Sequence, residues 1–188
     1  IVDSLNKTNE VALSITGDEQ VTLDQDEVSF TVSVSNTNKL ATAALELALD
    51  TKTMAEPTVE GLNGWYVIAQ TYANGKLNVV MGNNAGVSGE AASDMLKLTA
   101  KLTGKAGSAS VEITSAELSG YTDDAESFVP AILGENAKVV TEINYSIYDV
   151  NQDGVINQLD ITRAQRAYGA SEGDATWNPL ADVNDDGT

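Results

Sequence analysis

The sequence contains no cysteine and no histidine. Without cysteine the chain can form no disulfide bond, no thiol nucleophile and no thiolate metal site. Without histidine, a Ser-His-Asp triad and zinc sites of the usual nitrogen or sulfur type are excluded. The remaining metal ligands are oxygen atoms, which suit hard cations and above all calcium.

Basic residues and long apolar runs are also scarce. Ten basic side chains stand against 28 acidic ones, which gives a formal net charge of −18. A charge of this sign repels nucleic acid and anionic lipid, because both partners need a basic surface. The apolar runs are far shorter than the ~20 residues that span a bilayer. We therefore expect no nucleic-acid binding and no membrane insertion. Because the chain begins with Ile1 rather than Met, we also expect a fragment or a processed product.

Most of the chain reads as short strands. Residues 28–34 alternate apolar and polar side chains, and residues 44–49 do so with a similar period, which is typical of half-buried strands. The pair Asn74-Gly75 separates two further strand patterns, and such a pair favours a tight hairpin. The pattern predicts an antiparallel β-sandwich of about nine strands.

The pattern changes after Tyr145. Apolar residues recur at three- and four-residue spacings over residues 156–168, which predicts a helix with one apolar face, and Gly169 is well placed to end it. We therefore divide the chain into three parts. These are a linker over residues 1–8, a β-sandwich over residues 9–143, and a small calcium-loop module over residues 144–188.

Residues 149–160 fit the calcium-loop pattern D-x-[DN]-x-[DN]-G, with an acidic residue at the twelfth position. Alternate residues of such a loop point inward, and the glycine at its sixth position allows the sharp bend around the ion. A short acidic cluster is often only a solvated turn, but six matched positions before a helix favour a calcium site. The predicted ligands are Asp149, Asn151, Asp153, the Val155 carbonyl, Asn157 through a water molecule, and Asp160.

A partial second copy of this motif follows 33 residues later, at residues 182–187. Asp182, Asn184 and Asp186 match the first three ligand positions, and Thr188 would provide the backbone carbonyl. The 188 residues hold no closing carboxylate for this loop. We expect one well-formed calcium site and a second, incomplete site that is weak or empty.

Residues 146–188 resemble a dockerin, the small calcium-dependent docking module of cellulosome-type assemblies. The resemblance rests on the loop 149–160, the helix that follows it, the connector ending at residues 177–180, and the repeat at 182–187. An aspartate at position 160, where EF-hands have glutamate, is itself dockerin-like. The resemblance implies that the helix faces dock a cohesin module. The implied partner-binding positions are Gln158, Leu159, Arg166 and Ala167.

Residues 9–143 resemble a cohesin, the partner module, through the order of their strands. The resembling segments are residues 11–15, 20–34, 43–50, 75–83, 94–102 and 104–120. The resemblance implies a jelly-roll sandwich. It leaves open whether this sandwich itself binds a dockerin.

Together the two resemblances imply a non-catalytic scaffolding protein. They imply a secreted bacterial assembly that degrades polysaccharide, free in the medium or at the cell surface, with a cohesin on another protein as partner. An alternative is a carbohydrate-binding sandwich with a dockerin tail, taken from a larger secreted glycoside hydrolase. Trp65, Tyr66 and Tyr72 could then stack on sugars, although such residues more often pack a core. Asp123, Asp124 and Glu126 could form a catalytic carboxylate pair, but a solvated loop is commoner, so we expect no enzyme.

Overall fold

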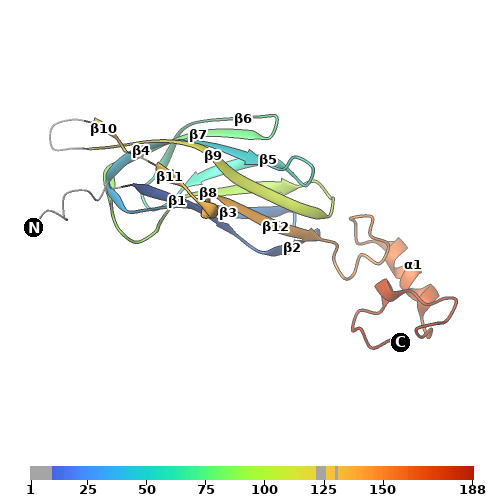
Figure 1. Cartoon of the computed structure of the whole chain (residues 1–188). Helices are drawn as coiled ribbons and strands as arrows, with labels where there is room; N and C mark the ends of the chain where they lie inside the picture. Colours follow the sequence, from blue (N-terminus) through green and yellow to red (C-terminus); the bar gives the residue numbers. More distant parts are fainter. Residues whose placement is uncertain (1–9, 122–125, 130) are drawn as a thin grey trace, which may run out of the picture.

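The computed structural model describes residues 10–121, 126–129 and 131–188 (Figure 1). Asp123 and Asp124, and the predicted linker 1–8, lie outside the described residues. The elements are β1 (Val11–Gly17), β2 (Gln20–Thr22), β3 (Glu27–Ser35), β4 (Thr37–Leu49), β5 (Met54–Gly61), β6 (Tyr66–Ala73), β7 (Lys76–Gly89), β8 (Ser93–Leu102), β9 (Gly107–Tyr121), β10 (Glu126–Val129), β11 (Ala131–Leu133), η1 (Glu135–Ala137), β12 (Lys138–Asn144), α1 (Gln158–Ala167) and η2 (Pro179–Ala181).

The strands form two sheets that pack face to face as a sandwich. One sheet has five strands in the order β11-β1-β3-β8-β5. The other has seven strands, in the order β2-β12-β9-β4-β7-β6, with β10 paired to β9. The mainly β sandwich predicted from the sequence is confirmed.

The core lies between the sheets because the strands alternate as the sequence predicts. In β3, Val28, Phe30 and Val32 are buried, whereas the serine and threonine between them are partly exposed. In β4, Leu45 and Leu47 point inward and Glu46 points outward. Each large apolar side chain that is fully buried contributes about 1.5–3 kcal/mol relative to an exposed one.

The Asn74-Gly75 hairpin forms where the sequence predicts it. Both residues have positive φ angles, 52° and 77°, which the tight turn between β6 and β7 requires. An added Cβ at Gly75 would lie 3.0 Å from the carbonyl oxygen of Leu49, so the close approach of β4 also requires glycine.

The strand inventory goes beyond the expected nine. The additional elements β2, β10 and β11 have only three or four residues each, too few for an alternating pattern to stand out. Two of these short strands pair in parallel, β11 with β1 and β2 with β12, whereas the remaining pairings in the described residues are antiparallel.

The C-terminal part follows β12 after a four-residue connection and lies at one end of the sandwich (Figure 1). Its helix α1 is shorter than the predicted 156–168, because Asn157 acts as the N-cap and leaves Ile156 outside the helix. Gly169 follows α1 with a φ of 78°, as expected for a helix stop. Within the described part of the chain, no helix is long and apolar enough to cross a bilayer.

Candidate calcium loops and docking surfaces

The first candidate loop is organised around Asp149. This residue is 4% exposed, and both of its carboxylate oxygens accept hydrogen bonds from the loop backbone. Asp149 Oδ1 lies 3.2 Å from the nitrogen of Asp153, and Oδ2 lies 2.8 Å from the nitrogen of Gly154. The loop is therefore folded back onto its first residue.

The two following ligand positions hold the turn in the same way. Asn151 Oδ1 accepts a hydrogen bond from the Asp153 nitrogen at 2.8 Å, and Asp153 Oδ1 accepts one from the Val155 nitrogen at 3.0 Å. Gln152 and Gly154 have φ angles of 56° and 88°, which make the sharp bend that the motif needs. These contacts place the side-chain oxygens of alternate residues on the inside of the turn.

The far side of the loop is closed by Asp160, which is 2% exposed. Its Oδ2 accepts a hydrogen bond from the Asn157 nitrogen at 2.7 Å, and its Oδ1 accepts one from the Asn151 nitrogen at 3.1 Å. The hydrogen bond from Asn157 is the main reason that the pKa of Asp160 lies below its usual value, and the Asn151 nitrogen lowers this pKa further. The side chain of Asp149 lowers the pKa of Asp160 as well.

Asn157 has a role that the sequence motif did not reveal. Its Oδ1 accepts a hydrogen bond from the Leu159 nitrogen at 2.8 Å, so Asn157 and Asp160 form a reciprocal capping box at the start of α1. Its Nδ2 donates to the Val155 carbonyl at 3.1 Å. An Asn followed three residues later by Asp was the available signal.

The donor set of this loop fits calcium by its chemistry. It consists of carboxylate, amide and carbonyl oxygens, which are the ligands that calcium prefers. Among the described residues, no group of three Asp or Glu side chains is gathered tightly enough to form a metal site from carboxylates alone. The amide of Asn151 and the Val155 carbonyl would therefore have to complete the set with Asp149, Asp153 and Asp160.

The second loop repeats the geometry of the first at an offset of 33 residues. Asp182 Oδ1 lies 3.2 Å from the Asp186 nitrogen, and Oδ2 lies 2.8 Å from the Gly187 nitrogen. The Thr188 nitrogen donates to Asp186 Oδ1 at 3.0 Å, as Val155 does to Asp153 in the first loop. The backbone therefore folds alike in both copies.

The second loop differs in exposure and in the contacts of Asp186. This carboxylate is exposed and accepts hydrogen bonds from the hydroxyl of Thr188 at 2.6 Å and from the Asn184 amide at 2.7 Å. The Thr188 hydroxyl is the main reason that the pKa of Asp186 lies below its usual value. Asp182 is only partly buried, unlike Asp149.

Helix α1 exposes most of the predicted partner-binding positions. Gln158, Leu159 and Arg166 are exposed, whereas Ala167 is 8% exposed and lies on the buried side of the helix. Arg163, which the sequence reasoning missed, is exposed four residues after Leu159 and three before Arg166, so the three share one face. The three- and four-residue spacing of Leu159, Arg163 and Arg166 was the sequence signal for this position. Both arginines of the chain lie on this helix.

A different face of α1 borders an apolar groove of about 750 Å³. Ile161 lines it from the helix, Tyr168 lines it from the position just after the helix, and Trp177 lines it from the connector. Tyr168 is 93% exposed, so its ring covers little of the groove.

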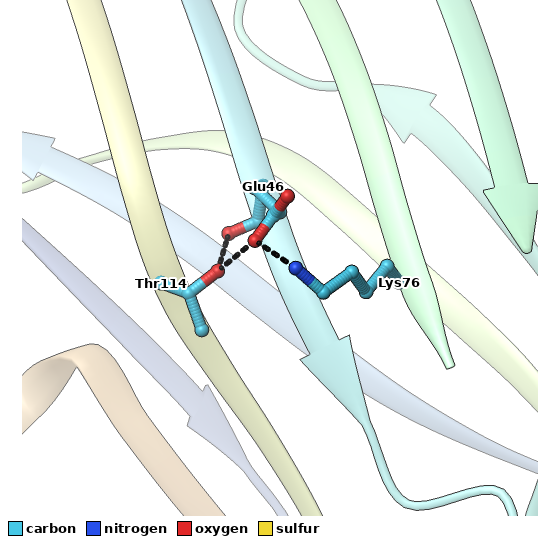
Figure 2. A network of polar contacts seen from close by, with 3 residues as sticks. All are labelled: Glu46, Lys76 and Thr114. Carbon is cyan, nitrogen blue, oxygen red and sulfur yellow. Dashed lines mark hydrogen bonds and ion pairs between the residues drawn. The ribbon is translucent and has the colours of Figure 1, made fainter. Parts of the chain in front are cut away.

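The outer face of the seven-stranded sheet carries a polar network across three strands (Figure 2). Lys76 of β7 donates to Glu46 of β4 at 3.0 Å, and Thr114 of β9 lies 2.8 Å from the same carboxylate oxygen. Thr114 also lies 3.2 Å from the Glu46 carbonyl oxygen, at a point where the β4–β9 register shifts. The hydrogen bond from Lys76, followed by that from Thr114, lowers the pKa of Glu46.

Apolar side chains flank this network on β6 and β7. Tyr66, Ile68, Tyr72 and Val80 are between 37% and 55% exposed. The Tyr66 hydroxyl donates to Asn84 at 2.9 Å. Trp65, by contrast, is 3% exposed within the core, so it cannot stack on a sugar. Its indole nitrogen finds no hydrogen-bond partner among the residues that the structure describes.

Comparison with known families assigns the C-terminal part. Residues 147–188 match the dockerin type I domain. The match includes both candidate loops and α1, and the predicted dockerin resemblance is confirmed. Dockerin type I domains bind calcium. No curated protein matches the chain.

Comparison with solved structures assigns the fold of the N-terminal part. The sandwich is similar to a cohesin module of a family 33 glycoside hydrolase from Clostridium perfringens, with 13% identity, a TM-score of 0.60, and coverage of 73% of this chain and 98% of that one. It is also similar to the seventh ScaB type I cohesin of Pseudobacteroides cellulosolvens, with 14% identity, a TM-score of 0.59, and coverage of 73% of this chain and 94% of that one. A third similar structure is the Coh-OlpC-Doc435 cohesin–dockerin complex of Clostridium thermocellum. Its identity to this chain is 15% and its TM-score is 0.54, with coverage of 71% of this chain and 94% of that one. The chain thus joins a cohesin-like fold to a dockerin type I domain.

Proposed function

We propose that this chain is a non-catalytic docking protein of a secreted, cellulosome-type bacterial assembly that degrades polysaccharide. Residues 9–143 form the cohesin-like module and residues 144–188 the dockerin module, with residues 1–8 as a linker. The observation that carries the proposal is the doubled loop geometry next to α1, within the segment that matches the dockerin family. The occurrence of a cohesin–dockerin complex among the similar structures supports it.

Calcium would be held in the first loop by the oxygens of Asp149, Asn151, Asp153 and Asp160 and by the Val155 carbonyl, with Asn157 acting through water. In the second loop Asp182, Asn184, Asp186 and the Thr188 carbonyl would contribute. The ion supplies positive charge that offsets the repulsion between the loop carboxylates. The module spans few residues and has little core, so binding of the ion adds directly to the free energy of folding.

The dockerin module would present Leu159, Arg163 and Arg166 to a cohesin. Titration of the immobilised chain with purified type I cohesins in calcium tests this surface. Arg166→Glu should weaken binding by tenfold or more, because a charged contact at an interface core is worth about 1.4 kcal/mol or more. Gln165→Glu, which changes charge at an exposed position outside this face, is the matched control and should leave affinity nearly unchanged. Equal loss in both variants would count against the proposed face.

The sandwich would bind a dockerin through the exposed face of β6 and β7. Ile68, which is 55% exposed, lies among the apolar side chains of that face. Ile68→Asp should abolish capture of a matching dockerin. Ile132→Asp changes an equally apolar side chain that is 42% exposed on the other sheet. This variant should still capture the dockerin.

A carbohydrate-binding sandwich is the second candidate, favoured by the exposure of Tyr66 and Tyr72 on one strand. Rings exposed in this way can stack on sugars. A pull-down on insoluble polysaccharide tests this function. Retention that disappears in the Tyr66→Ala, Tyr72→Ala double variant would favour it, and absence of retention by the unaltered chain would eliminate it for the polysaccharides tested.

A further inference from the structure

The first calcium loop does not lie free in solvent, because the end of the sandwich packs against it. Gly154 lies so close to the turn between β8 and β9 that an added Cβ would be 2.8 Å from the Gly104 carbonyl oxygen. At Gly187, the corresponding glycine of the second loop, no atom of the described residues would lie within 4 Å of such a Cβ. The backbones of the two loops fold alike, and the contact with the Gly104 turn is one further difference between them.

A second part of the sandwich borders the same loop. The turn between β2 and β3 and residues of the first loop together line a cleft of about 290 Å³. Asp24 and Asp26 line this cleft from the sandwich, and Asp149 lines it from the loop. Ser146, which is 7% exposed, lies in the short connection from β12 to the loop and lines the cleft as well.

The charged side chains that line this cleft are all acidic, and the basic side chain of the Gly104 turn is the exposed Lys105. Asp24 and Asp26 are exposed carboxylates that face a loop already carrying Asp149, Asp153 and Asp160. Carboxylates of like charge within a Debye length, about 8–10 Å at physiological salt, repel one another. A divalent cation in the loop would cancel two of these charges, whereas removal of the ion would leave the repulsion in full.

We propose that the first loop is also the joint between the two modules, and that calcium in this loop docks the dockerin module against the Asp24–Asp26 turn and the Gly104 turn. The calcium-loaded chain then holds its two binding faces in one relative orientation. Without calcium the joint opens and the modules move independently. This inference rests on the calcium binding of the proposed function and adds the regulation of the same site.

Hydrogen exchange of the full chain, read by mass spectrometry in calcium chloride and in EDTA, tests the joint. Calcium should slow exchange in residues 102–106 and 22–26 of the sandwich by roughly tenfold or more, because protection reports the local opening equilibrium. It should slow residues 149–160 as well. Residues 86–90, which precede β8 at the other end of that strand, should not respond.

Two sets of variants sharpen this result. Asp24→Asn with Asp26→Asn removes the repulsion from the sandwich side and touches no loop ligand, so residues 102–106 should gain protection in EDTA. The matched control is Glu60→Gln with Glu90→Gln, which neutralises two exposed carboxylates elsewhere on the sandwich. This control should not change the protection of residues 102–106 in EDTA. Gly154→Ala should weaken the calcium response of residues 102–106, whereas Gly187→Ala, with a similar φ of 81°, should retain it.

The outcomes separate the joint from calcium binding itself. Protection by calcium that is confined to residues 149–160 would overturn the joint and leave the proposed function intact. Calorimetry that detects no calcium binding to the chain would overturn the calcium function and the joint together.

Discussion

The carboxylate of Asp160 lies 2.7 Å from the backbone nitrogen of Asn157, so the residue predicted to close the calcium loop also closes the start of helix α1. A glutamate or aspartate that reaches back in this way satisfies an N–H group that the helix itself leaves free. The loop and the helix that would carry the docking face therefore share one carboxylate. Calcium binding at the loop, as proposed, would therefore be coupled to order in the helix through this contact.

Asp160→Asn tests the shared role. The amide keeps one oxygen acceptor for the backbone but loses the charge, so calcium affinity should fall by roughly ten- to hundredfold, since ligand charge sets the affinity of such loops. Isothermal titration calorimetry with calcium chloride measures the change. Asp185→Asn makes the same charge change at an exposed position of the module that is not a predicted ligand. Equal affinity in the two variants would remove Asp160 from the ligand set.

Removal of calcium should separate the thermal unfolding of the two modules. Binding to the native state alone stabilises a module by RT ln(1 + [L]/Kd), which is about 2.7 kcal/mol at a hundredfold excess over Kd. Scanning calorimetry in EDTA should show an earlier transition for residues 144–188, while most of the sandwich transition persists. Identical profiles in calcium and in EDTA would contradict calcium binding.

The ion pair between Glu46 and Lys76 predicts an acid sensitivity of the sandwich. Because these contacts lower the pKa of Glu46 in the folded chain, their stabilisation is present above the unfolded value of 4.5. It is lost as the pH falls through the folded pKa. NMR titration of the Glu46 carboxylate should show this pKa rise in Lys76→Met. Lys101→Met breaks the separate Lys101–Glu56 pair and should leave Glu46 unchanged.

The hairpin turn between β6 and β7 should not tolerate a side chain. Gly75→Ala would place a Cβ at a φ of 77° and 3.0 Å from the Leu49 carbonyl, so we expect the sandwich to lose about 1–3 kcal/mol. Denaturant unfolding of the sandwich transition measures the loss. Gly134→Ala is the control, since its φ is −94° and its Cβ would meet no atom within 4 Å in the part of the chain that the structure describes. A Gly75→Ala variant as stable as the Gly134→Ala variant would show that the turn relaxes.

Much of this architecture could be predicted because its signals are local. The alternation in β3 and β4 follows from side chains that point to opposite faces, and the turn at Asn74-Gly75 follows from backbone freedom. The loop at residues 149–154 was readable because each ligand position has a fixed offset, and its hydrogen bonds fold as the motif requires. Calcium coordination by these residues stays a prediction.

Features that depend on distant parts of the chain could not be read in advance. The parallel pairings of β2 with β12 and of β11 with β1 join segments more than a hundred residues apart, and three-residue strands carry no period. The burial of Trp65 depends on how the turn between β5 and β6 packs against the core, which the local sequence does not reveal. The approach of Gly154 to Gly104 joins two turns that have no pattern in common.

The four-residue connection between β12 and Asp149 has a mechanical consequence. A pull on the dockerin module reaches the sandwich directly along β12, with little slack to absorb it. Strand β12 is held on both sides, by β9 in antiparallel and by β2 in parallel register. Ladder hydrogen bonds run across the strand axis, so a force along β12 loads them in shear and they must yield together. We therefore expect β12 to resist tension that is applied through the dockerin module, and single-molecule extension would measure the force at which it yields.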